Sequence, residues 1–135
     1  MENGFHIGKI YIEELIKMAI KEARIASGLS QAKLSNLLGI PLLTLQSYEE
    51  GYRKCRPWLE QLLVAAIEKG EPIEEHKEFT TVKEARKAKG WTQVQLSAAL
   101  GIPKRTIEDW DSGSHLPTDW CRRLVIDNIV KYEDE

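Results

Sequence analysis

Long apolar runs are missing from this 135-residue chain. No stretch approaches the roughly 18 to 20 apolar residues that cross a bilayer. Residues 1–9 also lack the apolar segment of a signal peptide. We therefore expect a cytoplasmic protein with no membrane partner.

Cysteine and histidine are scarce. Cys55 and Cys121, the two cysteines, do not occupy equivalent positions in the repeat described below, which argues against a disulfide or a repeated metal site. The histidines His6, His76 and His115 lack the spacing of a ligand pair on one helical face. No nucleophile, carboxylate pair or phosphate-binding glycine loop recurs. We expect no enzymatic activity, no cofactor and no metal.

Positive charge is not in excess either, because the formal net charge is -2. Proteins that bind DNA phosphates usually carry a basic surface. Much of the acid lies at residues 71–78 and 133–135, where it need not face a nucleic acid. The composition therefore leaves a nucleic-acid partner open.

The sequence does contain a duplication. Residues 21–69 align without a gap on residues 83–131, at a constant offset of 62, and 19 of the 49 pairs are identical. This indicates two copies of one structural unit. We predict units at residues 1–70 and 81–135, joined by an acidic linker at residues 71–80. Extended, the linker spans about 33 to 36 Å, close to the roughly 34 to 36 Å between half-sites one DNA turn apart; alternatively it folds back.

Each copy has helical periodicity, and nothing alternates with the period of a strand. The first copy predicts helices over about 11–27, 31–38, 41–50 and 58–69, and the second repeats this order between Thr81 and Tyr132. The apolar stripe of the first helix comprises Ile12, Leu15, Ile16, Ala19, Ala23 and Ala26. The predicted fold is all-α, with roughly four helices per unit.

Caps and breaks support these boundaries. Ser30 and Thr92 are expected N-caps, and Thr81 lies three residues before Glu84, the spacing of a capping box. Glycines follow the predicted helices at 28, 39 and 51 and again at 90, 101 and 113. Pro41 and Pro103 are expected at the first helical position.

A short helix, a turn containing Gly-Ile-Pro and a second short helix ending in aromatic-acid-x-Gly form a helix-turn-helix signature. It occurs as Gly-Leu-Ser-Gln-Ala-Lys-Leu-Ser-Asn-Leu-Leu-Gly-Ile-Pro and as Gly-Trp-Thr-Gln-Val-Gln-Leu-Ser-Ala-Ala-Leu-Gly-Ile-Pro. Both copies resemble the Cro and phage-repressor (Xre-type) helix-turn-helix family. The resemblance implies two tandem lambda-repressor-like units and a bacterial or phage-type transcriptional regulator that binds double-stranded DNA.

In this family the second helix of the motif, here called the recognition helix, lies in the major groove. The matching positions of the second copy are Lys104, Arg105, Thr106, Glu108 and Asp109. The cations could donate to guanine, and the acids could accept from cytosine N4. The threonine could contact a phosphate or a thymine methyl.

The first copy departs from this pattern. Its matching positions are Leu42, Leu43, Thr44, Gln46 and Ser47. The leucines offer no donor or acceptor, so they either contact thymine methyls or mark a protein interface. The alternative function is a protein-interaction module, antitoxin-like or a phage accessory protein, with reduced DNA binding and with a partner or a second copy at Leu42 and Leu43.

Further positions follow from the resemblance. Gln31 and Gln93 open the helix before the recognition helix, where they would contact the DNA backbone or support that helix; otherwise they are capping or solvent-exposed residues. Arg53, Lys54 and Arg56 follow the first recognition helix and are expected to contact phosphates. 

Four charged positions and two tryptophans recur in structural roles. Arg24 and Arg86 recur on the first helices, and Glu49 and Asp111 recur two residues before a terminal glycine. The family resemblance implies that each arginine forms a salt bridge with the acid of its own copy. The tryptophans, Trp58 and Trp120, are expected in the cores.

Overall fold

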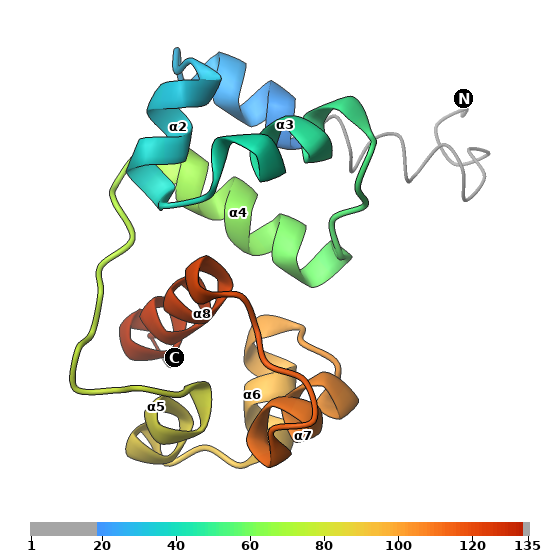
Figure 1. Cartoon of the computed structure of the whole chain (residues 1–135). Helices are drawn as coiled ribbons and strands as arrows, with labels where there is room; N and C mark the ends of the chain where they lie inside the picture. The colour runs from blue at the N-terminus through green and yellow to red at the C-terminus, as the bar shows by residue number, and fades with distance from the viewer. Residues whose placement is uncertain (1–18, 134–135) are drawn as a thin grey trace, which may run out of the picture. The chain divides into compact units, whose positions relative to one another are not determined.

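The computed structural model describes residues 19–133 (Figure 1). Over these residues the chain is helical and has no strand. The chain divides into two compact units, residues 1–72 and 73–135. The predicted all-α fold of two tandem units is confirmed. Within the described part, no helix has both the length and the apolar character to cross a membrane.

The first unit contains a helical segment at residues 19–26, followed by α2 (Gln31–Leu38), α3 (Leu42–Glu50) and α4 (Pro57–Lys69). Its core gathers apolar side chains from all four helices and from the turn between α2 and α3: Ile20, Leu34, Leu38, Ile40, Leu45, Tyr48, Trp58, Leu59, Leu62, Leu63, Ala66 and Ile67. These positions recur three and four residues apart along the helices, so burying them places one face of each helix inward.

The stripe predicted for the first helix is partly wrong. Ala26 is exposed, whereas Ile20, which the stripe omits, is 1% exposed. The larger side chain of Ile20 removes more apolar surface from water than a terminal alanine does, which explains the choice of buried face. The stripe positions at 12, 15 and 16 lie outside the described residues.

The second unit contains α5 (Val82–Lys89), α6 (Gln93–Leu100), α7 (Lys104–Ser112) and α8 (Asp119–Lys131). α5 packs against α7 and α8, and α6 packs against α7. Its buried apolar side chains are Val82, Ala85, Leu96, Leu100, Ile102, Ile107, Trp120, Cys121, Leu124, Val125, Ile126 and Ile129. The two tryptophans predicted in the cores are therefore both buried.

The predicted caps form, but the capping box predicted at Thr81 is shifted by one residue. Thr92 Oγ1 accepts from Gln95 N at 3.1 Å while Gln95 Oε1 accepts from Thr92 N at 2.8 Å, a complete capping box. At α5, Thr81 Oγ1 accepts from Glu84 N, but the Glu84 carboxylate accepts from the N–H of residue 80 at 2.7 Å.

The two motif prolines precede their helices instead of opening them. Pro41 and Pro103 have ψ of 136° and 138°, so they are the N-cap residues of α3 and α7. Extended backbone at the proline is the ordinary geometry of an N-cap, and its missing N–H leaves no donor unsatisfied.

Candidate nucleic-acid interface

In each copy a three-residue turn fixes the recognition helix against the helix before it. Gly39 and Gly101 adopt φ of 72° and 77°, the left-handed conformation that glycine enters without a steric penalty. Ile40 and Ile102 then enter the core, with 2% and 0% exposure. Ser35 Oγ donates to Ile40 O at 2.5 Å. The pairs α2–α3 and α6–α7 can be followed in Figure 1.

A buried charge network supports α3 from behind. Arg24 Nε and Nη2 donate to the two carboxylate oxygens of Glu49 at 2.7 and 3.0 Å. Gln31 Nε2 donates to Glu49 Oε1 at 2.9 Å, and Arg24 Nη1 donates to Leu29 O at 2.9 Å. Because Glu49 lies in the last turn of α3, this network holds the helix to the first helix and to α2. We call it the brace.

The brace of the second copy is formed by the equivalent residues, with aspartate in place of glutamate, and lacks one of the contacts. Arg86 Nη2 and Gln93 Nε2 donate to Asp111 Oδ2 at 3.1 and 2.8 Å, and Arg86 Nη1 donates to Trp91 O. Arg86 Nε and Asp111 Oδ1 are buried with no hydrogen-bond partner among the described residues. Aspartate is one methylene shorter than glutamate, so the bidentate pair of the first copy is not reached. The two predicted salt bridges are nevertheless both present.

The glutamines at 31 and 93 therefore donate to brace carboxylates. Both are partly buried. Of the roles expected from the sequence, this geometry fits support of the recognition helix, and neither glutamine is the cap residue of its helix.

The recognition surface of α7 carries two ion pairs between residues one turn apart. Lys104 Nζ lies 3.3 Å from Glu108 Oε2, and Arg105 Nε lies 3.2 Å from Asp109 Oδ1. Asp109 Oδ2 also lies 3.7 Å from His115 Nδ1. Thr106 is half-buried. The structure thus brings the predicted donors and acceptors together on one exposed surface.

The corresponding surface of α3 is uncharged. Leu43 is 75% exposed and Leu42 is 39% exposed. Thr44, Gln46 and Ser47 are all half-buried. Gln46 Nε2 donates to Gln31 Oε1 at 3.5 Å, which links this recognition residue to the brace.

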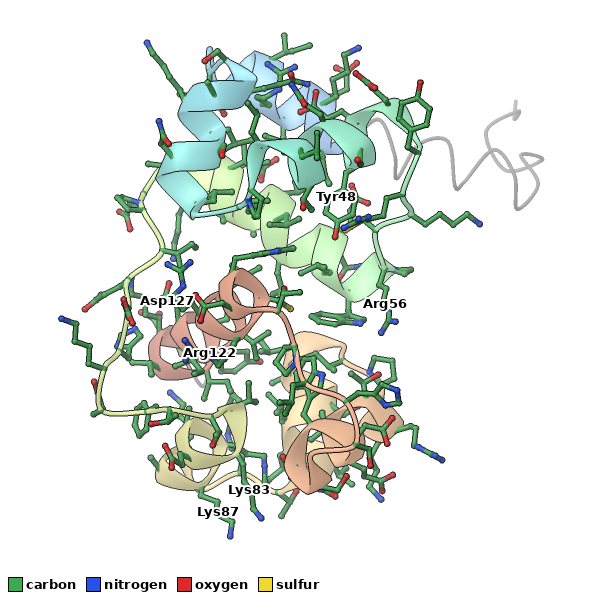
Figure 2. The ribbon with its side chains drawn as sticks, viewed as in Figure 1. Tyr48, Arg56, Lys83, Lys87, Arg122 and Asp127 are labelled. Atoms are coloured by element: carbon green, nitrogen blue, oxygen red, sulfur yellow. The ribbon has the colours of Figure 1, made fainter. Side chains whose placement is uncertain are left out.

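The loops after the two recognition helices differ in charge. Arg53 N donates to Ser47 O at 3.2 Å, and at the equivalent place His115 N donates to Asp109 O at 3.3 Å. Arg53, Lys54 and Arg56 are all exposed, and Figure 2 shows Arg56 at the start of α4. The second loop has no lysine or arginine between α7 and α8. Only the first loop therefore offers a cationic surface beside its recognition helix.

Two other charged groups were missed by the sequence analysis. Glu60 on α4 is 4% exposed, and burial raises the pKa of its carboxyl to about 7 although a hydrogen bond from the Ile20 backbone lowers it. It lies on the same helical face as Leu63 and Ile67, and this spacing was the available signal.

The second charged group that the sequence analysis missed is a cluster around His76 and Asp127. It connects the segment predicted as linker to α8. His76 Nε2 lies 2.8 Å from Asp127 Oδ1, and the ligand atoms of Glu74, His76 and Asp127 lie within 4.8 Å of one another, an arrangement that could hold a metal ion. Lys131 Nζ already lies 3.4 Å from Glu74 Oε1 and 3.3 Å from Asp127 Oδ1. Burial lowers the pKa of Lys131, but the neighbouring Asp127 and Glu74 carboxylates raise it overall. A salt-bridge network therefore accounts for this cluster.

The geometry defines a class of protein: two helical units, each presenting an exposed recognition helix held by a buried brace. Comparison with known families agrees, because the model described as helix-turn-helix matches residues 20–55 and 82–119. These ranges cover more than half of the chain, and the protein belongs to the Cro/phage-repressor helix-turn-helix family, as a tandem member. It is a DNA-binding helix-turn-helix regulator, in a family that is generally non-enzymatic. No curated protein and no solved structure matched the chain.

Proposed function

We propose that this protein is a sequence-specific regulator of transcription that binds double-stranded DNA, with the recognition helix of each unit in the major groove. The observation that carries the proposal is that both recognition helices are anchored from behind by a buried brace while their N-terminal side chains stay exposed. A rigid helix with exposed side chains is what base recognition requires.

The proposal assigns two kinds of contact. Base contacts fall to residues of α3 and α7, and phosphate contacts to the loop after α3, because phosphates position a protein while base edges specify the sequence. The base-contacting set is Thr44, Gln46, Ser47, Lys104, Arg105, Thr106, Glu108 and Asp109, and the phosphate-contacting set is Arg53, Lys54 and Arg56. Gln31 and Gln93 support the helices and lie near the backbone of the DNA.

We place the protein in the cytoplasm of a bacterium, acting on a bacterial or phage operator, as the family resemblance implies. It acts by occupying the operator, without a chemical step. Because the copies differ at the recognition positions, the operator is an imperfect palindrome or a direct repeat.

The test is selection from a randomised duplex library at about 50 and 200 mM salt, a range over which phosphate contacts change affinity strongly. The wild type is compared with Lys104→Ala/Arg105→Ala and with Lys83→Ala/Lys87→Ala, which removes the same charge from exposed positions of α5 (Figure 2). We expect one motif in the wild type, its retention by the α5 variant and its loss in the α7 variant. No enrichment, or the same motif in all three proteins, would contradict the proposal.

The exposure of Leu42 and Leu43 favours a second candidate, a protein-interaction module with a partner or a second copy on α3. Under this alternative, Leu42→Ser/Leu43→Ser would leave any selected motif unchanged and alter the sedimentation behaviour of the protein. Under the leading proposal, the same variant alters the motif.

A further inference from the structure

We propose that the two recognition helices read half-sites of opposite base composition, A·T-rich for α3 and G·C-rich for α7. The inference rests on the proposed function and adds to it the chemical identity of each half of the operator. It follows from two pairs of residues on each helix, four positions apart and equivalent in the two copies. These are Leu42/Gln46 and Leu43/Ser47 in α3, and Lys104/Glu108 and Arg105/Asp109 in α7.

Each pair on α7 holds a hydrogen-bond donor beside an acceptor. The donor and acceptor atoms are 3.3 Å apart in the Lys104/Glu108 pair and 3.2 Å apart in the Arg105/Asp109 pair. The major-groove edge of a G·C pair has the complementary pattern, with guanine N7 and O6 as neighbouring acceptors and cytosine N4 as the adjacent donor. Only guanine offers two neighbouring acceptors to a guanidinium, so Arg105 binds it bidentately while Asp109 accepts from the paired cytosine.

The charge balance of α7 points to bases instead of phosphates. The two cations of residues 104–109 are matched by two carboxylates, so this surface carries no net charge. A neutral surface gains little from phosphate attraction, which depends on neutralising the backbone with excess positive charge. The paired charges are useful where the DNA itself presents both acceptors and donors, and that place is the floor of the major groove.

The same positions of α3 match an A·T pair. The thymine C5-methyl is the apolar group that the major groove presents, and leucine methyl groups can contact it. Leu43, at 75% exposure, and Leu42, at 39%, lie at the start of α3, where the recognition helix enters the groove. Neither side chain can satisfy the guanine acceptors or the cytosine donor, so a G·C pair opposite them loses hydrogen bonds to water.

Gln46 supplies the adenine contact. Its Nε2 donates one hydrogen to Gln31 Oε1 at 3.5 Å, and Gln31 is itself held by Glu49 at 2.9 Å. An amide nitrogen carries two hydrogens. The second hydrogen can donate to adenine N7 while Gln46 Oε1 accepts from adenine N6, the bidentate pairing that glutamine makes with this base. Leu42 lies one turn earlier on the same face, beside the position of the paired thymine methyl.

The loop after α3 favours DNA over a protein as the occupant of this leucine surface. Arg53 is tied to the end of α3 through its bond to Ser47 O at 3.2 Å, and Arg53, Lys54 and Arg56 are exposed there. The leucines open α3 and the cations follow its last residue, so the apolar and the cationic groups lie at the two ends of the same helix. DNA offers both a thymine-rich groove floor for the leucines and a phosphate backbone for the cations, whereas an apolar protein partner would leave the cations without a role.

The test is a reciprocal exchange of the recognition surfaces, which the 62-residue offset makes possible. One variant converts α7 to the α3 surface (Lys104→Leu/Arg105→Leu/Glu108→Gln/Asp109→Ser). The other converts α3 to the α7 surface (Leu42→Lys/Leu43→Arg/Gln46→Glu/Ser47→Asp). Each full-length variant and the wild type are used in library selection. Circular dichroism checks the fold, and the smaller exchange Leu43→Arg/Ser47→Asp replaces the second variant if that variant unfolds.

We expect one A·T-rich and one G·C-rich half-site in the wild-type motif, two A·T-rich halves for the first variant and two G·C-rich halves for the second. Each exchanged base pair should change preference by roughly 5- to 150-fold. A wild-type motif whose halves do not differ in this way would overturn the inference and leave the proposed function intact. Halves that differ but do not follow the exchanged residues would overturn the inference together with the base contacts proposed for α3 and α7. Absence of any wild-type motif would overturn both.

Discussion

Replacing Glu60 with glutamine should stabilise the first unit at alkaline pH. Glu60 is 4% exposed, and burial outweighs the hydrogen bond from the Ile20 backbone in its effect on the pKa of the carboxyl. The charged form is therefore poorly solvated, and the pKa of the carboxyl is raised from 4.5 to about 7. Glutamine keeps the shape of the side chain and removes the charge.

The sign and size of the effect follow from linkage between protonation and folding. The folded unit holds the Glu60 proton more tightly than the unfolded chain does, so the free energy of unfolding falls as the pH rises from about 4.5 to about 7. Across the full shift the loss is at most about 3 kcal/mol. Above pH 7 the loss is complete, and below pH 4.5 it is absent. Glu60→Gln should therefore gain most at pH 8 and little at pH 4.5.

Urea unfolding followed by NMR measures the effect in each unit of the full chain separately. Glu68→Gln is the matched control, because Glu68 lies on the same helix and is exposed. The quantity compared is the difference between variant and wild type at each pH, which cancels the titration of the other groups. A direct readout is the carboxyl carbon shift of Glu60 as a function of pH.

Two results would refute this reasoning. One is a Glu60 titration midpoint at the ordinary value near 4.5. The other is a stability gain from Glu60→Gln that does not change with pH, which would mean that the glutamine acts through packing and not through charge. A gain of the same size in Glu68→Gln would likewise show that general electrostatics, not burial, is responsible.

Three further changes have defined outcomes. Asp111→Glu should let the carboxylate reach the unpartnered Arg86 Nε and stabilise the second unit by about 1 to 2 kcal/mol, measured by urea unfolding; a destabilisation would mean that the brace has no room for the longer side chain. Thr92→Ala should remove the capping box of α6 and cost about 1 kcal/mol in the same assay, and no loss would show that solvent replaces the cap. Arg53→Ala/Arg56→Ala should make the slope of log affinity against log salt concentration shallower by about 0.9 for each lost phosphate contact, without changing the selected motif. An unchanged slope would mean that these residues do not contact the DNA.

The sequence was sufficient for the scaffold because the scaffold depends on short-range signals. Ser30 and Thr92 cap their helices as predicted, and the glycines at 39 and 101 end helices as predicted, in the left-handed conformation. These features depend on residues a few positions apart, and each of them occurs once in each copy of the repeat. The Arg24–Glu49 and Arg86–Asp111 pairs are long-range, and they were predictable because the family resemblance implies a salt bridge at these recurring positions.

Features that occur in one copy only were missed. Glu60 corresponds to Arg122, and His76 has no counterpart within the aligned region, so the repeat offers no second example of either environment. The contact between His76 and Asp127 joins positions 51 apart, and no spacing rule relates a loop histidine to a helix carboxylate at that separation. Burial removes the Glu60 carboxyl from water, which is costly for a charged group. Residue type alone therefore predicts an exposed position.

The same comparison between the two copies shows where their recognition helices differ. Brace and turn positions are the same or chemically similar in the two copies, because any change there alters the packing of the recognition helix. At the five recognition positions only Thr44 and Thr106 are identical, and the others change from apolar or neutral to charged. Exposed positions are free to diverge without loss of stability, and under the proposed function this divergence gives the two surfaces different chemical groups to contact. That contrast connects the duplication to two unlike half-sites, and the reciprocal exchange of α3 and α7 surfaces tests it directly.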